Sequence, residues 1–179
     1  MTRPLVVSAT RAEAAHVPDG VDVVICGIGK VDAAVATTRA ILERRPSSVT
    51  NLGTAGALRP HTEGLFVPSA VLNHDLSADV LRGLGHPAVD RIDISDGDGT
   101  VLATGDVFVT DPVVRDVLAE RATLVDMEGF AIAAACRALH VPFRLVKHVS
   151  DPADETALDW PVLVDASARV LGRWVTDHL

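Results

Sequence analysis

The chain has 179 residues, of which 48% are hydrophobic and 22% are charged, a balance typical of soluble globular proteins and unlike that of disordered ones. A chain of this length fits one domain and can bury roughly 70% of the surface that its unfolded form exposes. The formal net charge of −8 repels a phosphate backbone, so the composition argues against nucleic acid as a partner.

Targeting, membrane and redox signals are weak throughout the sequence. The segment Met1–Val7 has one Arg and no long apolar stretch, so we expect no signal peptide, and no apolar run approaches the roughly 18 residues of a membrane span. Cys26 and Cys136 lie in apolar segments without metal-ligand spacing, as buried reduced thiols do. We therefore expect a cytoplasmic protein with no membrane partner and no metal site.

In the first third of the chain, strand-like and helix-like segments alternate. Leu5–Ser8 and Val21–Cys26 are predicted strands, and the second is a run of Val and Ile typical of strands buried on both faces. Lys30–Arg44 is a predicted helix that Pro46 stops, and Ser48–Leu52 is a predicted short strand. The helix has apolar residues at helical spacing at Val31, Ala34, Val35, Thr38, Ile41 and Leu42.

The rest of the chain continues the pattern of an α/β protein. Gly64–Leu72 and Arg91–Thr104 indicate strands of a mixed or antiparallel part, the second bent by a hairpin turn at 96–99. The remaining predicted elements are the helix Pro112–Arg121, the strand Thr123–Val125, the helix Glu128–Leu139, the strand Phe143–Val149 and the helix Pro161–Leu179, with Leu163, Ser167, Val170 and Trp174 on one face. These elements predict a single α/β domain over residues 1–179, with a central mixed sheet flanked by helices.

Two glycine-rich segments follow predicted strands. Gly27-Ile28-Gly29 begins like a dinucleotide fingerprint, but Asp32 takes the third glycine position and the next strand ends without an acid to bind a ribose, which disfavours an NAD enzyme. In the segment 51–57, small residues let the backbone approach a ligand, and the Thr54 hydroxyl can hold a water or a sugar oxygen. A plain glycine turn is the alternative for this segment.

Two acidic segments lie near the ends of later strands. Asp126-Met127-Glu128 stands where a strand turns into a helix, so Glu128 can be a helix-dipole partner or an acceptor for two ribose hydroxyls. Ser150-Asp151 follows the apolar strand Phe143–Val149, where poor solvation favours the protonated carboxyl and lets it carry a proton near neutral pH. A helix N-cap or turn is the structural alternative for Asp151.

Taken together and in this order, the segments resemble the methylthioadenosine/S-adenosylhomocysteine nucleosidases and their nucleoside-phosphorylase relatives. The most specific part is the Asp-Met-Glu-Gly at the start of a late helix, paired with a Ser-Asp after the next strand. The matching segments are 8–13, 27–34, 51–58, 103–108, 125–131 and 149–151. The resemblance covers nearly the whole chain and implies a single-domain, three-layer fold of the phosphorylase type.

The resemblance implies a role for each residue that matches the motifs of the family. Asp151 is expected to be the general acid that gives a proton to N7 of the purine, with Ser150 orienting it. Glu13 is expected to position and activate the attacking water. Glu128 is expected to bind the ribose 2′- and 3′-hydroxyls, with Met127 packing beside the sugar.

Further residues are implied around the base and the nucleophile. Phe108 matches the aromatic residue that stacks on the base, Val109 gives backbone contacts, and Trp160 takes the place of a Phe near the base. The loop near the water or phosphate site matches Thr54, Ala55 and Gly56. The resemblance implies no cofactor, no metal, a purine nucleoside as the small-molecule partner, and a homodimer.

The nucleophile decides between hydrolase and phosphorylase. Phosphorylases of this superfamily bring arginines to the phosphate, whereas here Asn51 precedes the middle loop and Glu13 occupies the early turn, with Arg11 nearby. Water is therefore the favoured nucleophile. We expect hydrolysis of a nucleoside similar to 5′-methylthioadenosine or S-adenosylhomocysteine to free base and a ribose derivative. A phosphate-dependent purine nucleoside phosphorylase, a futalosine-type hydrolase and a non-catalytic nucleoside-binding module are the alternatives.

The sequence also departs from the family pattern. The segment between Asp75 and Gly105 is expected to lack a helix that relatives usually have, which leaves the 5′-substituent pocket undefined. Lys147 stands where an Arg is common and His148 is unusual, and the sequence assigns neither a role.

Overall fold

The computed structural model describes residues 3–179, so Met1 and Thr2 of the segment Met1–Val7 lie outside it. In chain order the elements are β1 (Leu5–Ser8), β2 (Asp22–Ile25), α1 (Lys30–Arg44), β3 (Val49–Ala57), β4 (Leu65–Phe66), β5 (Ala70–Asn73), α2 (Ala78–Gly83), β6 (Arg91–Asp93), β7 (Val101–Thr104), α3 (Pro112–Ala119), β8 (Leu124–Asp126), α4 (Gly129–Ala138), β9 (Phe143–Asp151), a 3₁₀ turn (Glu155–Asp159) and α5 (Trp160–His178). In residues 3–179, no helix is both long and apolar enough to cross a bilayer.

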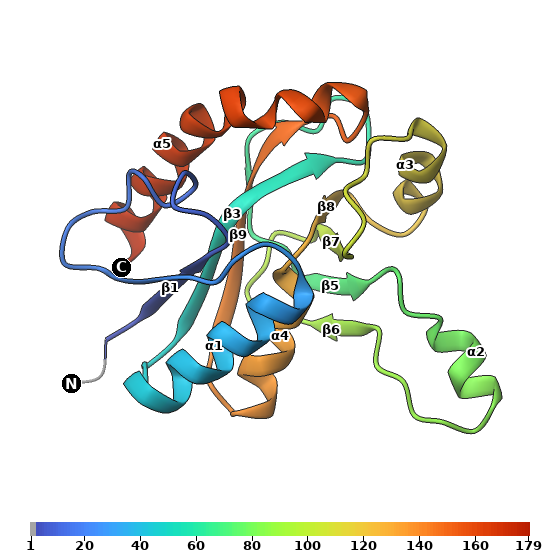
Figure 1. Ribbon diagram of the computed structural model, residues 1–179, viewed down its shortest axis with the longest axis horizontal. Helices are drawn as coiled ribbons and strands as arrows, with labels where there is room; N and C mark the ends of the chain where they lie inside the picture. The colour runs from blue at the N-terminus through green and yellow to red at the C-terminus, as the bar shows by residue number, and fades with distance from the viewer. Residues whose placement is uncertain (1–2) are drawn as a thin grey trace.

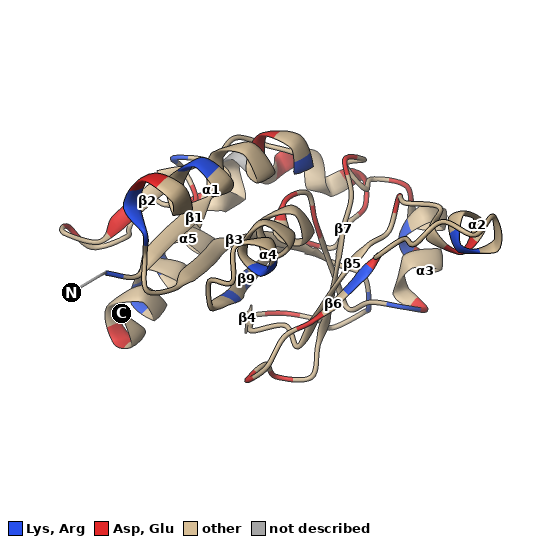
Figure 2. Ribbon diagram, turned by 90° about the horizontal axis from the view of Figure 1, so that it is seen from below, with Lys and Arg blue, Asp and Glu red and all other residues tan. Residues whose placement is uncertain are grey.

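The strands form one mixed sheet, which confirms the predicted fold class. Its path runs β2-β1-β3-β8-β7-β5-β6, and β9 pairs with both β3 and β4. Pairing is parallel between β1 and β2, β1 and β3, and β3 and β9, but antiparallel between β3 and β8 and between β5 and β6. The sheet therefore extends from β2 and α1 at one end to β6, α2 and α3 at the other (Figures 1 and 2).

Helices cover both faces of the parallel half of the sheet. Successive residues of a strand face opposite sides, and β1 shows this directly. Leu5 and Val7 pack in one core with residues of α1 and α4, among them Ile132. Val6 packs in another core with Leu171 and other residues of α5. The molecule thus has three layers, with α1 and α4 on one face and α5 on the other (Figure 1).

Strand β2 is less buried than its composition predicts. All its residues are half-buried, although their Val and Ile content indicated burial on both faces. The reason is position, because β2 is the last strand on the path of the sheet and pairs with β1 alone among the described strands. An apolar run therefore marked a strand correctly and its environment wrongly.

Helix α1 has the predicted bounds but turns another face to the core. Its buried residues are Ala33, Thr37, Ala40 and Ile41. Val31, Val35 and Leu42, three of the apolar residues whose spacing predicted the helix, are 72%, 64% and 61% exposed. Ala33, Ala40 and Ile41 of this helix pack in the same core as residues of α4, and the small alanines allow a close approach of the two helices.

Helix α5 is rotated in the same way relative to the prediction. Its core-facing residues are Val164, Ser167, Ala168, Leu171, Trp174 and Val175. Leu163 is 38% exposed and Val170 is half-buried, so two of the four residues expected on the inner face lie at or beyond its edge. The packing of α5 against Leu52 and Val146 of the sheet sets this orientation.

The segment 91–104 is not the expected hairpin. Strands β6 and β7 both pair with β5, one antiparallel and the other parallel, and so lie on opposite sides of it. The turn between them docks on the segment before β5, where Asp98 accepts a hydrogen bond from the Val67 amide (2.6 Å) and Ser69 accepts one from Gly99 (2.7 Å). The preceding segment also contains the short helix α2, whereas no helix was expected there.

A glycine in α5 fixes the loop that follows β1. A Cβ on Gly172 would lie 2.2 Å from the carbonyl oxygen of His16, which is closer than real Cβ atoms come to a neighbouring backbone atom. We expect Gly172→Ala to lower the free energy of unfolding by roughly 1–3 kcal/mol, because helix α5 and this loop must move apart. Urea denaturation measures the change.

Gly83, in α2, gives the matched control, because a Cβ there meets no atom within 4 Å. Gly83→Ala should change stability by at most about 1 kcal/mol, in the stabilising direction. Equal stability of Gly172→Ala and the wild type would contradict the proposed contact.

Candidate active site

One cavity of about 320 Å³ lies where β1, β3, β8 and β9 end. Its size is in the range of small-molecule sites, and the carboxyl ends of strands are the usual ligand-binding edge of an α/β sheet. Every residue to which the sequence gave a site role lines it, namely Glu13, Thr54, Ala55, Gly56, Phe108, Val109, Met127, Glu128, Ser150, Asp151 and Trp160. Segments that are far apart in the chain therefore meet at one place, while their chemical roles stay predictions.

The middle glycine segment is part of a strand and not a turn. Strand β3 continues to Ala57, five residues past its predicted end at Leu52, because it pairs in parallel with β9 along its length. A Cβ on Gly53 would lie 3.1 Å from Glu13 Oε1 and 3.2 Å from Lys147 Nζ. The glycine is thus explained by close approach of charged side chains to the strand, and Thr54 is held on a rigid element.

A β-bulge brings two neighbouring residues of β9 into the cavity. Ala55 pairs with Val149 and Gly56 pairs with Asp151, so Ser150 is the extra residue in the register. In a regular strand, successive side chains point to opposite faces, and a bulge changes this direction locally. Both Ser150 and Asp151 consequently line the cavity, although the sequence placed them in a loop after the strand.

The carboxyl group of Asp151 is fixed on both oxygens. Oδ2 accepts a hydrogen bond from the Ser150 hydroxyl (2.6 Å), and Oδ1 accepts one from the Ala153 amide (3.0 Å). The residue is 9% exposed, and Gly56 lies close enough that a Cβ there would be 3.1 Å from Asp151 Oδ1. The group is neither a helix N-cap nor part of an ion pair within residues 3–179, so it faces the cavity with its orientation already set.

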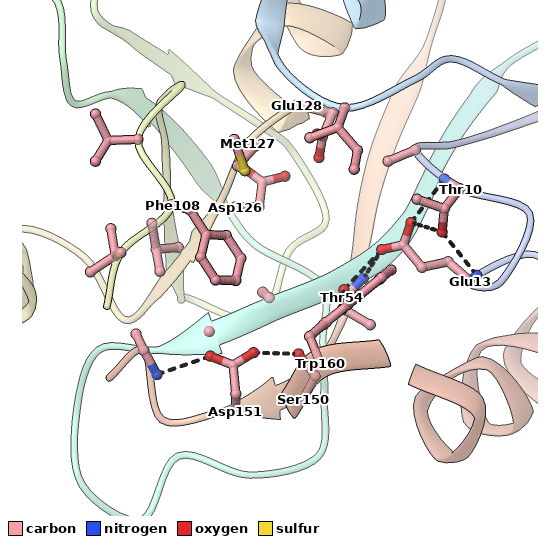
Figure 3. Close-up of a pocket in the computed structure, with 18 residues that line it drawn as sticks. Thr10, Glu13, Thr54, Phe108, Asp126, Met127, Glu128, Ser150, Asp151 and Trp160 are labelled. Carbon is pink, nitrogen blue, oxygen red and sulfur yellow. Dashed lines mark hydrogen bonds between the residues drawn. The ribbon is translucent and has the colours of Figure 1, made fainter. Parts of the chain in front are cut away.

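Glu13 is held at the other end of the cavity by four hydrogen bonds (Figure 3). Oε2 accepts from the amide and the hydroxyl of Thr10, both at 3.0 Å. Oε1 accepts from the amide (2.8 Å) and the hydroxyl (2.9 Å) of Thr54. Glu13 is 4% exposed, and the donors compensate for the loss of solvent around its charge.

Asp126, and not Glu128, caps helix α4, although Glu128 occupies the N-cap position. Asp126 Oδ2 accepts a hydrogen bond from the Gly129 amide (2.9 Å) and so caps α4, whereas Glu128, at the N-cap position, makes no capping bond. Glu128 Oε1 accepts from the Gly29 amide across the cavity (2.8 Å). The helix-dipole role considered for Glu128 thus belongs to Asp126, and Glu128 is free to face a ligand.

A buried lysine sits among these acids. Lys147 is 1% exposed, and its Nζ lies 2.8 Å from Asp126 Oδ2. Burial lowers the pKa of Lys147, but the attraction of Asp126, Glu128 and Glu13 outweighs burial, so the pKa is raised and the amine stays charged. Lys147 therefore stabilises the negative charge of three carboxylates from inside the sheet.

Burial also acts on Glu128. It raises the pKa of Glu128 to about 7, the repulsion from Asp126 adds to this effect, and Lys147 opposes it. Glu128 consequently changes its charge near neutral pH, in a cavity where hydroxyl groups of a ligand would need an ionised acceptor.

Apolar and aromatic side chains form the rest of the wall. Phe108 lies toward the same end of the cavity as Asp151, with Met127 above it in the view of Figure 3 and Glu13 at the far end. Phe108 is 46% exposed and Val107 56%, so this wall is open to solvent at the mouth of the cavity. None of the lining residues in the described part of the chain is Lys or Arg, and Arg11 is exposed outside the cavity.

Three residues in and around the site, Thr10, Asp126 and Lys147, received no role from the sequence, although each had a recognisable sequence signal. Thr10 and Glu13 have the spacing of a capping box, and the structure shows its reciprocal bonds, with the Glu13 amide donating to Thr10 Oγ1 (3.2 Å). Asp126 occupies the first position after a short apolar strand. Lys147 interrupts an apolar strand, and a buried charge without a partner is rare.

His148 and the pair His74-Asp75 lie apart from this cavity. His148 Nδ1 is hydrogen-bonded to Ser167 on α5 (2.9 Å), and Asp75 forms an ion pair with Lys30. Within the described part of the chain, no three His, Cys, Asp or Glu side chains are arranged to hold a metal ion.

Comparison with known proteins places this chain in a family. The family model described as "Phosphorylase superfamily" matches residues 11–97 and 98–171. The 5′-methylthioadenosine/S-adenosylhomocysteine nucleosidase of Geobacillus thermodenitrificans is 33% identical over 165 residues, which are 76% of this chain and 70% of that protein. The enzyme of the same name from Geobacillus kaustophilus is 29% identical over 84% of this chain and 76% of its own length.

Solved structures agree in fold. The 5′-methylthioadenosine/S-adenosylhomocysteine nucleosidase from Helicobacter pylori, in a structure with butyl-thio-DADMe-Immucillin-A, gives a TM-score of 0.87 at 24% identity and covers 100% of this chain and 99% of its own. The futalosine hydrolase of the same organism also gives 0.87, at 23% identity and with 99% and 98% coverage. At these identities the two structures show the fold.

The raised pKa of Glu128 predicts a pH effect on stability. Between pH 4.5 and about 7 the native state keeps a proton on Glu128 that the unfolded chain releases. The contribution of Glu128 to the free energy of unfolding is therefore complete below pH 4.5 and is lost as pH rises toward about 7. Relative to that of Glu128→Gln, the free energy of unfolding of the wild type should fall by up to about 1.4 kcal/mol for each pH unit in this window. Urea denaturation at a series of pH values measures the difference.

Glu63→Gln is the matched control, because Glu63 is exposed and lies outside this cavity. Its stability relative to the wild type should not vary over the same pH range. A constant difference between the wild type and Glu128→Gln across the window would contradict the assigned protonation.

Proposed function

The chain belongs to the phosphorylase superfamily, as a member similar to the methylthioadenosine/S-adenosylhomocysteine nucleosidases, and we propose that it hydrolyses the N-glycosidic bond of a purine nucleoside. The products are the free base and a ribose derivative. The observation that carries the proposal is that three carboxyl groups, those of Glu13, Glu128 and Asp151, line one cavity together with an aromatic ring. Cleavage of a glycosidic bond by paired carboxyl groups is an established use of such an arrangement.

Asp151 is the proposed acid on the leaving base. In the protonated form it gives a proton to N7 of the purine, so that the base leaves neutral while positive charge develops on the sugar. The Ser150 hydroxyl and the Ala153 amide keep the carboxyl group oriented without an exposed contact to solvent. Acid catalysis by one such group is typically worth about 10²–10⁴-fold in rate.

Glu13 is the proposed residue that positions and activates the attacking water on the other side of the sugar. Its four donors hold it in place at the end of the cavity away from Phe108. A fixed acceptor at this place orders the water and, as bond cleavage proceeds, stabilises positive charge on the sugar.

The other lining residues are proposed to bind the nucleoside between these two groups. Glu128 accepts hydrogen bonds from the ribose 2′- and 3′-hydroxyls, and Met127 packs beside the sugar. Phe108 stacks on the base, with backbone contacts from Val109, and Trp160 lies near the base. The shared cavity supports this arrangement, because each of these residues borders the same space as Asp151.

Water is proposed as the nucleophile instead of phosphate. A phosphate ion in this cavity would meet Glu13 and Glu128 without a lysine or arginine among the described lining residues. Lys147 is close but is engaged with Asp126 inside the sheet. Placing an anion against unpaired carboxylates is unfavourable, so the electrostatics support a hydrolase.

The substrate is proposed to be a 5′-substituted purine nucleoside of the 5′-methylthioadenosine or S-adenosylhomocysteine kind. Sequence relatives with that name support this choice. A futalosine-type substrate is the second candidate, because the futalosine hydrolase of H. pylori shares the fold over nearly the full length of both chains.

A panel of nucleosides with and without phosphate tests the reaction. We expect free base to be released from 5′-methylthioadenosine or S-adenosylhomocysteine without phosphate, measured by liquid chromatography. Asp151→Asn should reduce turnover by roughly 10²–10⁴-fold with an unchanged circular dichroism spectrum, because the acid is lost and the fold is kept.

Asp177→Asn is the control, since Asp177 is exposed in the last turn of α5. It should leave turnover unchanged. Base release that requires phosphate would replace the hydrolase by a phosphorylase, and tight binding of nucleosides without base release would indicate a binding module.

The chain is further proposed to form a homodimer. Val31, Val35 and Leu42 are exposed on α1 at helical spacing and form an apolar strip, and Ile28, which lines the cavity before this helix, is 57% exposed. Exposed apolar surface of this kind is typical of protein–protein interfaces.

Sedimentation tests the dimer. We expect about twice the 18.8 kDa of one chain for the wild type and a monomer for Val35→Asp, because a charge on the strip would be buried without a partner. Val80→Asp on α2, at an equally exposed Val (63%), should leave the mass unchanged. A wild-type monomer would contradict the proposal.

A further inference from the structure

A tryptophan reaches the group that holds the proposed water-activating carboxylate. Trp160, the first residue of α5, lines the cavity half-buried, and its indole Nε1–H donates a hydrogen bond to Thr54 Oγ1 at 2.9 Å. Figure 3 shows Trp160 beside Thr54, between Ser150 and Glu13. The contact connects the start of α5 with the middle of the site.

The direction of this hydrogen-bond chain is fixed by its two ends. An indole N–H can only donate, and an ionised carboxylate can only accept. The Thr54 hydroxyl between them has one proton, so it accepts from Trp160 and must donate to Glu13 Oε1, at 2.9 Å. The two hydrogen bonds therefore run in one direction only, from Trp160 to Thr54 and from Thr54 to Glu13.

We propose that Trp160 is a positioning residue for the reaction, acting through Thr54 on Glu13. Its N–H occupies a lone pair of the Thr54 hydroxyl and prevents that hydroxyl from turning its proton toward water or a sugar oxygen. This inference rests on the proposed function, in which Glu13 orders the attacking water.

The arrangement around Glu13 explains why one hydroxyl matters. Four hydrogen bonds, from the amides and hydroxyls of Thr10 and Thr54, fix the orientation of the Glu13 carboxylate. The two amides are fixed by the backbone. The hydroxyl of Thr10 is anchored as well, because it accepts from the Glu13 amide (3.2 Å) while it donates to the carboxylate.

Thr54 has no corresponding backbone anchor among the described residues, and Trp160 supplies it. Each of the two hydroxyls is thus locked by a donor: a main-chain amide on one side of the carboxylate and an indole on the other. Hydrogen bonds in such a chain also strengthen one another in a poorly solvated site. The substitution Trp160→Phe would keep an aromatic ring against the cavity and remove the hydrogen bond to the Thr54 hydroxyl.

Kinetics of Trp160→Phe, Thr54→Val and the double variant test the proposal. Using the best nucleoside of the panel, we expect Trp160→Phe to lower kcat about 5-fold, the value of one neutral hydrogen bond, with KM changed by less than about 2-fold. In the Thr54→Val background the same change should have no further effect on kcat, because the hydroxyl that it orients is absent.

Thr54→Ser is the matched control background, since it keeps the hydroxyl. There, Trp160→Phe should again lower kcat about 5-fold. If Trp160 serves only as a wall, Trp160→Phe will raise KM or lower kcat by the same factor in all three backgrounds, and either result overturns the proposal.

Proton NMR of the indole group follows the contact without relying on turnover. The Trp160 Nε1–H signal is identified by its loss in Trp160→Phe, which leaves Trp174 as the other indole. We expect its exchange with solvent to be slower in the wild type and Thr54→Ser than in Thr54→Val. Equal exchange in all three overturns the proposal even if the enzyme is active.

The two proposals fail in different ways. A wild type that cleaves no nucleoside rejects the proposed function, and the positioning role falls with it whether or not the indole proton is protected from exchange. An active wild type whose variants act independently rejects the role of Trp160 alone.

Discussion

The site depends on one buried ion pair, between Lys147 on β9 and Asp126 at the end of β8. Both side chains are at most 2% exposed, and the charged atoms are 2.8 Å apart. Asp126 also accepts from Thr104 at the end of β7 (2.6 Å) and from the first amide of α4 (2.9 Å). One carboxylate thus connects three strands and a helix. Removing either partner would leave a buried charge alone, which is strongly destabilising.

This ion pair also gives the neighbouring acids Asp126 and Glu128 different roles. Asp126 accepts the hydrogen bond from the first amide of α4. Glu128, at the N-cap position, therefore makes no capping bond and faces the cavity. Lys147 offsets part of the repulsion that three buried carboxylates exert on one another, and it does so from behind the cavity wall. The cavity can therefore be lined by several acids while no Lys or Arg among the described lining residues faces a ligand.

Strands, and not flexible loops, carry the central residues of the site. Thr54 lies inside β3, and the bulge at Ser150 turns Asp151 into the cavity from the end of β9. Groups on regular elements are held more precisely than groups on loops, which suits a reaction that needs an acid and a water on opposite sides of a sugar. The loop that carries Glu13 gains comparable rigidity from its capping-box bonds and from Thr54.

The sequence by itself determined most of the strands and helices, the mixed α/β class, the family, and eleven of the residues that line the cavity, because periodicity and short motifs are local properties of the chain. It placed α1 within its observed bounds, but the helical spacing of Val31, Val35 and Leu42 did not show which face meets a neighbour. Only the tertiary structure decided that β6 and β7 flank β5, that Gly53 is a point of close approach, and that Lys147 pairs with Asp126. Each of these depends on contacts between residues distant in the chain, whose energies no local pattern contains.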